Sequence, residues 1–195
     1  VRLVYETDEK LNVAIEKLGI PMTMVSNNMG ARVEMLKNRF GPARQLALTV
    51  AMEHFTASLA EFILENPEVL DEAPETFRKM MLWHSVEEIE HKAVAFDVFR
   101  QQVNDEWMRR RVMVIAMISL FTRLSIFQIR MLWKTKHMPS IGEWVGAARF
   151  FWGKKGILRA NSNGMKKFFQ RDFHPNDIDQ SALIADWELK FPDVA

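Results

Sequence analysis

The amino-acid sequence predicts an all-α protein. Apolar residues recur three and four positions apart, as in amphipathic helices, and no alternating run of β-branched residues is followed by a hairpin turn. The 8 Gly and 7 Pro fall where helices should end. With 48% hydrophobic residues, a chain of 195 is long enough for one substantial core and short for two, so we expect a single domain over residues 1–195.

Breaking residues set the ends of the first three expected helices. Gly19 and Pro21 stop the first, and the second ends before Gly41. Pro42 suits the first turn of the third, which ends where Asn66-Pro67 follows. The expected helices cover residues 6–18, 24–38, 42–65, 71–102, 106–136, 140–152 and 157–170, and a last one follows the segment 175–177.

Capping residues set the starts of two later helices. Asp71 is expected to cap the fourth helix, which runs unbroken to about Gln102. Ser140 and Glu143 have the spacing of a capping box, in which each side chain bonds to the backbone of the other residue, so the sixth helix starts there.

The fifth helix, over residues 106–136, is long and apolar, but Arg123 interrupts its most apolar run. Arg109, Arg123, Arg130 and Lys134 share one helical face. We expect a core helix whose basic edge is solvated or pairs with acids, rather than a membrane span. The alternative is peripheral contact of this helix with an anionic membrane surface.

Charge and cysteine content exclude several classes of protein. The 26 basic and 25 acidic residues nearly cancel, so we expect no nucleic-acid partner. Without cysteines the chain has no disulfide framework, no thiolate metal site and no Cys nucleophile, which fits a cytoplasmic protein. No cleavable leader is visible, and because the chain begins at Val1 without an initiator Met, we expect residues to be missing upstream.

The segment 83–92 carries the strongest functional signal. His84, Glu87, Glu88 and His91 fall on one side of a single helix, at offsets of three, four and seven residues. Glu88 and His91 have the Glu-x-x-His spacing with which helical bundles hold di-iron and di-manganese centres. The pattern therefore predicts a metal site.

Glu53 is the expected ligand on the neighbouring helix. The third helix is apolar on two sides, and a buried carboxylate must be paired or bound to a metal. Antiparallel packing of the third and fourth helices would bring Glu53 opposite Glu88 and His91. A buried salt-bridge network and a solvated charged face remain the alternatives.

The candidate residues receive different roles. Glu88 and His91 are expected to be ligands, and Glu53 a bridging or terminal carboxylate. His84 is a further ligand or a supporting group, and Glu87 orients a histidine ring or accepts a proton, so these two are the candidate catalytic residues. The other histidines, His54, His137 and His174, are expected to serve the core, helix ends or surface.

Carboxylates with imidazoles suit iron or manganese, with zinc as an alternative. The visible ligands are half of a di-metal set, which leaves three alternatives: a mononuclear site, a homodimer joining two half-sites, or ligands upstream of Val1. Glu6 and Glu9 have Glu-x-x-Glu spacing, so their carboxylates could take the place of the missing ligands, although helix surfaces carry such pairs routinely.

Three segments, 51–57, 83–97 and 172–176, closely resemble the bacterial family called predicted metal-dependent hydrolases. The similarity runs from about Leu18 to the C-terminus. It implies a ferritin-like helical bundle with additional C-terminal helices and a di-metal site, and it implicates Glu53, His84, Glu88 and His91. Family members usually carry a further ligand helix ahead of the region where this chain begins, and this sequence lacks it.

Ligand chemistry favours a non-haem di-iron oxidase or oxygenase acting on a hydrophobic small molecule, because carboxylate-rich bundle sites suit oxygen activation. The first alternative is a metal-dependent hydrolase using a metal-activated water. The second is a non-catalytic protein that binds or stores metal, or a helical interaction module. The sequence contains no nucleophile elbow or phosphate-binding Gly-rich loop, which argues against triad hydrolysis and nucleotide chemistry.

Overall fold

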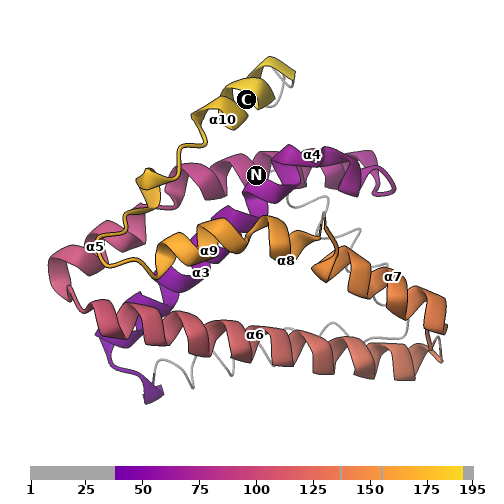
Figure 1. Ribbon diagram of the computed structural model, residues 1–195, viewed down its shortest axis with the longest axis horizontal. Helices are drawn as coiled ribbons and strands as arrows, with labels where there is room; N and C mark the ends of the chain where they lie inside the picture. Colours follow the sequence, from indigo (N-terminus) through magenta and orange to yellow (C-terminus); the bar gives the residue numbers. More distant parts are fainter. Residues whose placement is uncertain (1–37, 137, 155, 191–195) are drawn as a thin grey trace.

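The computed structural model describes residues 38–136, 138–154 and 156–190, and every regular element in these ranges is a helix (Figure 1), which confirms the all-α prediction. The expected helices over 6–18 and 24–38 lie outside the described residues, apart from Asn38. The ferritin-like arrangement remains a prediction. The elements are α3 (Pro42–Glu65), η1 (Pro67–Leu70), α4 (Glu75–His91), α5 (Val94–Gln102), α6 (Glu106–Thr135), α7 (Ile141–Trp152), α8 (Ile157–Ala160), α9 (Ser162–Phe168), η2 (Pro175–Asp177) and α10 (Ser181–Lys190).

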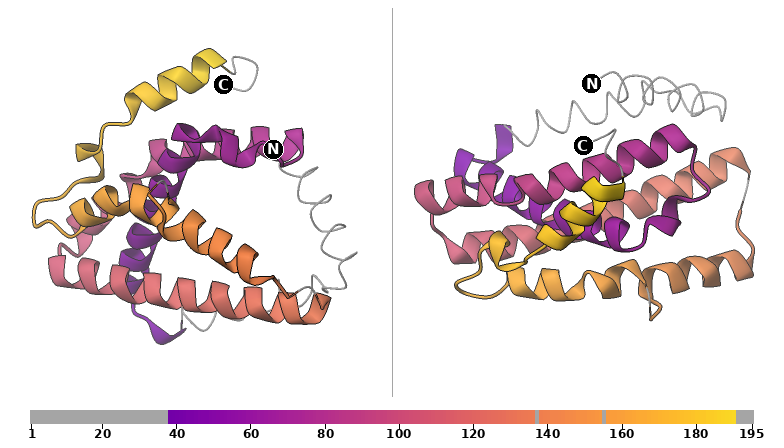
Figure 2. Two further views of the ribbon diagram at one scale, coloured as in Figure 1. Left: turned by 45° about the vertical axis from the view of Figure 1, so that its right-hand side comes forward. Right: turned by 90° about the horizontal axis from the view of Figure 1, so that it is seen from above.

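Helix α3 is the central element, with α4 and α5 packed on one side and α6 on another, while α9 lies across it (Figures 1 and 2). Pro42 occupies its first turn and Asn66 caps its end, as predicted. The main core forms where α3, α5, α6 and the segment 168–173 meet. Its buried members are Ala47, Val50, Ala51, Ala95, Phe96, Phe99, Met113, Ala116, Phe168 and Phe173.

The predicted fourth helix is two helices in the structure, because the chain breaks between His91 and Val94. At the break, the Lys92 ammonium donates to the carbonyl of Ile178 at 2.5 Å and to Oε1 of Gln180 at 2.8 Å. These partners lie some 86 residues away in the chain. The prediction of an unbroken helix was therefore wrong, and the residue that follows α4 is held by partners distant in the chain.

The start of α4 also differs from the prediction. Asp71 does not cap it: Pro74 occupies the N-cap position, and Asp71 forms an ion pair with Arg78 at 3.1 Å. The 3₁₀ turn η1 takes up the residues between Asn66 and Asp71. Similarly, the predicted helix over 157–170 is divided into α8 and α9 at Asn161.

The basic stripe predicted along α6 is interrupted, because Arg109 is fully buried. Its guanidinium donates to the carbonyls of Phe168 and Gln170, to the latter at 2.9 Å, and to Glu106 Oε2 at 2.6 Å. Arg123 and Lys134 remain exposed. The buried arginine thus ties the start of α6 to the end of α9, and only the rest of the stripe is at the surface.

Two described helices are long and apolar enough to cross a membrane by length and composition alone. The window in α3 has a mean hydropathy of 1.2 and is 50% buried, as expected of a core helix, which passes the same test. The window in α6 has a mean hydropathy of 1.9 and is only 11% buried. The apolar surface of α6 is therefore mostly left uncovered.

The predicted capping box opens α7. Ser140 Oγ accepts from the amide of Glu143 at 3.3 Å, and Glu143 Oε2 accepts from the amide of Ser140 at 2.7 Å. The carboxylate of Glu143 has a lowered pKa because it accepts hydrogen bonds from the hydroxyl of Ser140, at 2.7 Å, and from the amide of Ser140. Both the start and the end of the sixth predicted helix are confirmed.

Replacing Ser140 with Ala is expected to raise the exchange rate of the first α7 amides about fivefold, because loss of an N-cap costs about 1 kcal/mol. Since α7 contains no buried residue, the effect should stay local and the global unfolding midpoint should hardly move. Hydrogen–deuterium exchange checks this, with Ser125→Ala on the exposed face of α6 as control. Unchanged exchange in α7 would contradict the capping role.

Candidate metal centre

Helices α3 and α4 bring Glu53 and Glu88 into proximity. Thr56, one turn after Glu53, donates its hydroxyl hydrogen to Oε2 of Glu88 at 2.5 Å. The negative charge of Glu88 in turn raises the pKa of Glu53. The helix pairing predicted from the sequence is therefore present, while the ligand roles of these residues stay a prediction.

The carboxyl of Glu53 is half-buried between the helices. Burial raises its pKa above the ordinary value and is the largest influence. The backbone amide of Ala95, which donates to Oε2 at 3.3 Å, lowers the pKa, as does His91. Because Ala95 belongs to the first turn of α5, the break after His91 makes an unpaired helix-end amide available to Glu53.

Both carboxylate oxygens of Glu88 have a partner in the protein. Thr56 binds one carboxylate oxygen, Oε2, and Nε2 of His84 lies 3.3 Å from the other, Oε1. The Glu88 side chain is 25% exposed. Within the described ranges, neither Glu88 nor Glu53 forms an ion pair with a lysine or arginine.

The other three candidates lie further towards solvent. The side chain of His84 is 50% exposed and that of Glu87 is 37% exposed, with His84 Nδ1 and Glu87 Oε2 3.9 Å apart. His91 is exposed as well. His84 therefore lies between two carboxylates, where it orients Glu88 in the structure as it stands.

In the described residues, the oxygen and nitrogen atoms of the candidate ligands do not converge on one point where a metal ion could bind. No group of three or more His, Asp or Glu side chains there is arranged to hold a metal ion. The donor types suit a divalent cation, and Glu53 and Glu88 lie close enough for their charges to interact, but the side chains as they stand do not form a complete ligand set. The suggested Glu6 and Glu9 lie outside the described residues.

His54 is a core residue, as predicted. It is 3% exposed, its Nε2–H donates to the carbonyl of Gly164 at 3.0 Å, and its ring packs 4.8 Å from that of Phe168. Burial is the main cause that lowers its pKa to about 4. The imidazole is therefore neutral near pH 7 and turned away from Glu53.

His174 caps a helical turn, as predicted. Its Nδ1 accepts from the amide of Asn176 at 3.1 Å, so Nε2 carries the hydrogen and donates to Asp97 Oδ1 at 2.8 Å. The contact joins two of the segments that resemble the family, 83–97 and 172–176. His137 lies outside the described residues.

Two supporting residues, Thr56 and Asp97, were not predicted from the sequence. Thr56 lies one turn after Glu53, at the spacing that places both on the same face of α3, and this was an available signal. Asp97 pairs with a histidine 77 residues away, and no local spacing reveals such a contact.

Comparison with known families decides the class of this protein. The profile of a family described as "predicted metal-dependent hydrolase" matches residues 6–179. The chain belongs to this family. Comparisons with curated proteins and with solved structures give no match.

Membership in the predicted metal-dependent hydrolases confirms the resemblance seen in the sequence. It supports metal dependence and favours the hydrolase alternative over the di-iron oxidase that ligand chemistry suggested. The family description does not determine the metal, so iron, manganese and zinc remain candidates. Helical-bundle carboxylate sites serve both kinds of chemistry, which is why the donor types could not separate them.

Proposed function

We propose that this member of the predicted metal-dependent hydrolases binds a divalent metal between α3 and α4 and uses it to hydrolyse a hydrophobic small molecule. The proposed ligands are Glu53, Glu88, His84 and His91. The observation that carries the proposal is the half-buried pair Glu53 and Glu88, which has no lysine or arginine partner among the described residues and only histidines beside it. Burial, with a smaller contribution from the charge of Glu88, raises the pKa of Glu53, and a cation bound to its carboxylate would favour the ionised form.

Each carboxylate has one oxygen held by the protein. The amide of Ala95 holds Oε2 of Glu53, and the hydroxyl of Thr56 holds Oε2 of Glu88. Oε1 of each residue is left for another partner, which for Glu88 is currently His84. Hydrogen bonds that orient ligands in this way are typical of metal sites.

The two histidines would complete the set. His84 and His91 lie two turns apart on the α4 face that carries Glu88, and both rings are exposed. Exposed side chains change rotamer at low cost, so the imidazoles can turn towards the carboxylates when a cation is present.

A bound metal would supply a water whose pKa is lowered towards about 7, which is the nucleophile that hydrolysis needs. The side chains of the protein would transfer the protons. Glu87, 3.9 Å from Nδ1 of His84, is placed to accept a proton from that water or from the imidazole. We therefore assign proton transfer to Glu87 and His84.

A groove of about 770 Å³ between α3 and α6 supports a hydrophobic substrate. Its walls are mainly apolar, with Leu48 and Met52 contributed by α3. Leu48, Met52 and Thr56 follow one another at intervals of four residues, so one ridge of α3 leads from the groove to the residue that binds Glu88.

Metal content per chain tests the site. The protein is stripped with a chelator and reconstituted separately with Mn(II), Zn(II) and, anaerobically, Fe(II), followed by elemental analysis. We expect near-stoichiometric metal, and affinity at least about 100-fold lower in Glu53→Gln and Glu88→Gln, beyond the effect of losing a merely supporting group. Glu90→Gln is the matched control, because Glu90 is exposed on another face of the same helix.

Hydrolysis of a panel of aryl esters with increasing acyl length then tests the reaction. Glu87→Gln should lower kcat and leave metal content unchanged, whereas the ligand variants should lose both. If the protein binds no metal, or if both Glu variants bind it as the unmodified protein does, the proposed site is wrong. Oxygen-dependent optical bands with iron, without esterase activity, would instead support the oxidase.

A further inference from the structure

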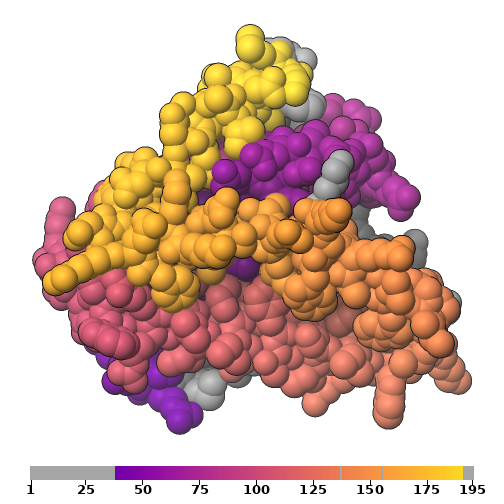
Figure 3. All heavy atoms as spheres, in the orientation of Figure 1, coloured from indigo at the N-terminus to yellow at the C-terminus, as the bar shows by residue number. Residues whose placement is uncertain are grey.

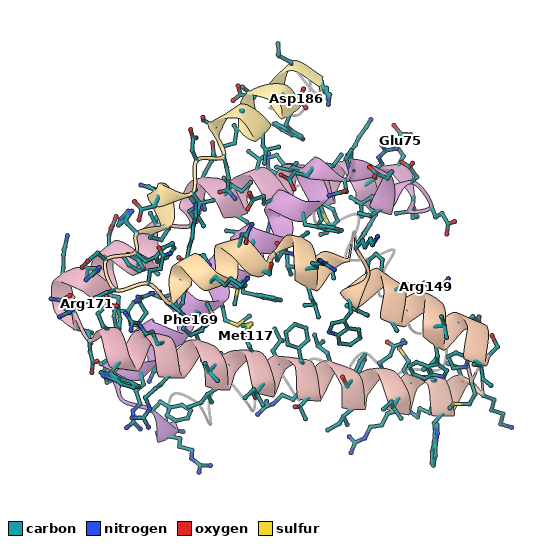
Figure 4. All side chains as sticks on the ribbon, viewed as in Figure 1. Glu75, Met117, Arg149, Phe169, Arg171 and Asp186 are labelled. Carbon is teal, nitrogen blue, oxygen red and sulfur yellow. The ribbon has the colours of Figure 1, made fainter. Side chains whose placement is uncertain are left out.

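The side of α6 that faces away from the core is apolar. Met113 and Ala116 are buried against α3 and its neighbours, yet Ile118 and Trp133 on the opposite side are 63% and 73% exposed. In Figure 1 the helix forms one edge of the molecule, and its second half extends past α3. Figure 4 shows Met117 pointing inwards from α6 towards α9, so the outward face is a separate surface.

Helix α7 is a second apolar element that the described part of the chain leaves exposed. None of its residues is buried, and Ile141 and Trp152 are 85% and 68% exposed. The helix departs from the end of α6 at the margin of the molecule (Figures 1 and 3). A helix that is apolar on most sides is normally enclosed by protein or lipid, so an uncovered one indicates a binding surface.

The same part of the chain is strongly basic. Between Glu106 and Asp172 there are fourteen Lys and Arg residues, and Glu143 is the single acidic one. The balancing acids lie elsewhere: Figure 4 shows Glu75 on α4 and Asp186 on α10, at the edge opposite α6. The near-zero net charge therefore hides a separation of charge along the chain.

We propose that the outward faces of α6 and α7 bind the surface of an anionic lipid bilayer. Exposed tryptophan and isoleucine side chains would enter the boundary between headgroups and acyl chains, while Arg130 and Lys134, at one edge of this apolar face, would contact anionic headgroups. This inference goes beyond the proposed hydrolase activity and does not depend on it.

The positive charge of this surface favours binding to a lipid bilayer over binding to a second copy of the chain. A symmetric dimer through this surface would bring two basic surfaces together, and like charges repel. An anionic bilayer has the opposite sign and accepts both the cations and the apolar side chains. Trp is also enriched at membrane interfaces, and four of the six Trp lie on α6 and α7.

The packing of α6 favours surface binding over a transmembrane span. Its first half carries the buried Arg109, which binds the carbonyls of Phe168 and Gln170. Moving this half into hydrocarbon would separate the arginine from those partners or take them into the bilayer as well. A helix lying on the surface keeps the contacts.

Vesicle binding tests the proposal with the full chain. Flotation is measured with phosphatidylcholine vesicles and with vesicles containing 3:1 phosphatidylcholine and phosphatidylglycerol, at low and high salt. We expect binding to the anionic vesicles, weakened by salt. Brominated acyl chains should quench a large share of the tryptophan emission, which tests insertion without any variant.

Matched variants test the surface. Arg130→Gln with Lys134→Gln should weaken binding about 25-fold, since each basic side chain near an anionic surface contributes about fivefold. Trp133→Gln with Trp152→Gln should weaken it about tenfold or more. Leu189→Gln is the control, because Leu189 is 83% exposed on α10, and it should change nothing.

The alternatives give different results. Absence of vesicle binding and of quenching would overturn the proposal, as would binding equally strong in all variants. A stable dimer that the Trp variants dissociate, without vesicle binding, would assign the surface to a second copy. Resistance of membrane-bound protein to alkaline carbonate would show a span in place of surface binding.

Discussion

Replacing Arg109 with Met is expected to lower the free energy of unfolding by about 3 kcal/mol. Arg109 is fully buried, and its guanidinium binds two carbonyls, those of Phe168 and Gln170, together with Glu106. Met preserves much of the side-chain length and apolar packing, so the loss measured is mainly that of the hydrogen bonds and charge.

The carbonyls account for most of this loss. Glu106 keeps Arg100 at 3.2 Å and Arg110 at 3.3 Å, so it is not left unpaired. The two carbonyls lose a buried donor, and each buried acceptor left unsatisfied costs about 1–3 kcal/mol. The guanidinium also lies 4.6 Å from the ring centroid of Phe168, and this cation–π contact disappears as well.

Urea denaturation measures the effect. Arg111→Met is the control, because Arg111 is an exposed arginine two residues further along the same helix, and its replacement should change stability by less than about 0.5 kcal/mol. Arg109→Lys should lie between the unmodified protein and Arg109→Met, since it keeps the charge but not the planar fork of donors. Equal stability of the Met variant and the unmodified protein would contradict a structural role for Arg109.

Acidification from pH 6.5 to pH 4 is expected to remove about 3 kcal/mol of stability through His54. In the folded protein, burial lowers the pKa of His54 to about 4 from an ordinary value of 6.5. The folded chain therefore keeps the imidazole neutral across a range in which the unfolded chain takes up a proton. The unfolded state binds more protons there, so stability falls as the pH falls.

The folded and unfolded pKa values of His54 set the pH range over which stability is lost. Above pH 6.5 neither state is protonated at His54, and its titration costs no stability. Below pH 4 both states are protonated, so the loss due to this residue stops growing. The stability is thus lost between the unfolded and the folded pKa of His54.

His54→Gln isolates the contribution, because a Gln amide nitrogen can replace Nε2 as the donor to Gly164 without titrating. The free energy of unfolding is measured for chelator-treated protein at several pH values, and the difference between the two proteins is plotted. The difference should change by about 3 kcal/mol between pH 6.5 and 4. A constant difference would mean that His54 titrates normally.

The proposed metal centre shows what side-chain pattern can and cannot predict. The face carrying His84, Glu88 and His91 is present on α4, and Thr56 connects Glu88 to the turn after Glu53 on α3. The donor types also favoured an oxidase, whereas the family description favours a hydrolase. Carboxylates and imidazoles bind the metals of both classes, so reaction type depends on how the metal and substrate are held.

Features that depend on a few neighbouring residues were predictable from the sequence alone. Pro42 opens α3 and the Ser140–Glu143 capping box opens α7, because the bonds that start a helix join residues within one turn. The core role of His54 followed from its position about 100° from Glu53. Helical periodicity likewise determined the all-α class.

Features that depend on distant partners were decided only by the tertiary structure. Lys92 at the helix break and the buried Arg109 are held by carbonyls of Ile178, Phe168 and Gln170, from the C-terminal third of the chain. A charged residue looks the same in sequence whether water or a buried carbonyl receives its hydrogen bonds. Packing selects between these environments, because it determines which backbone groups are left without partners.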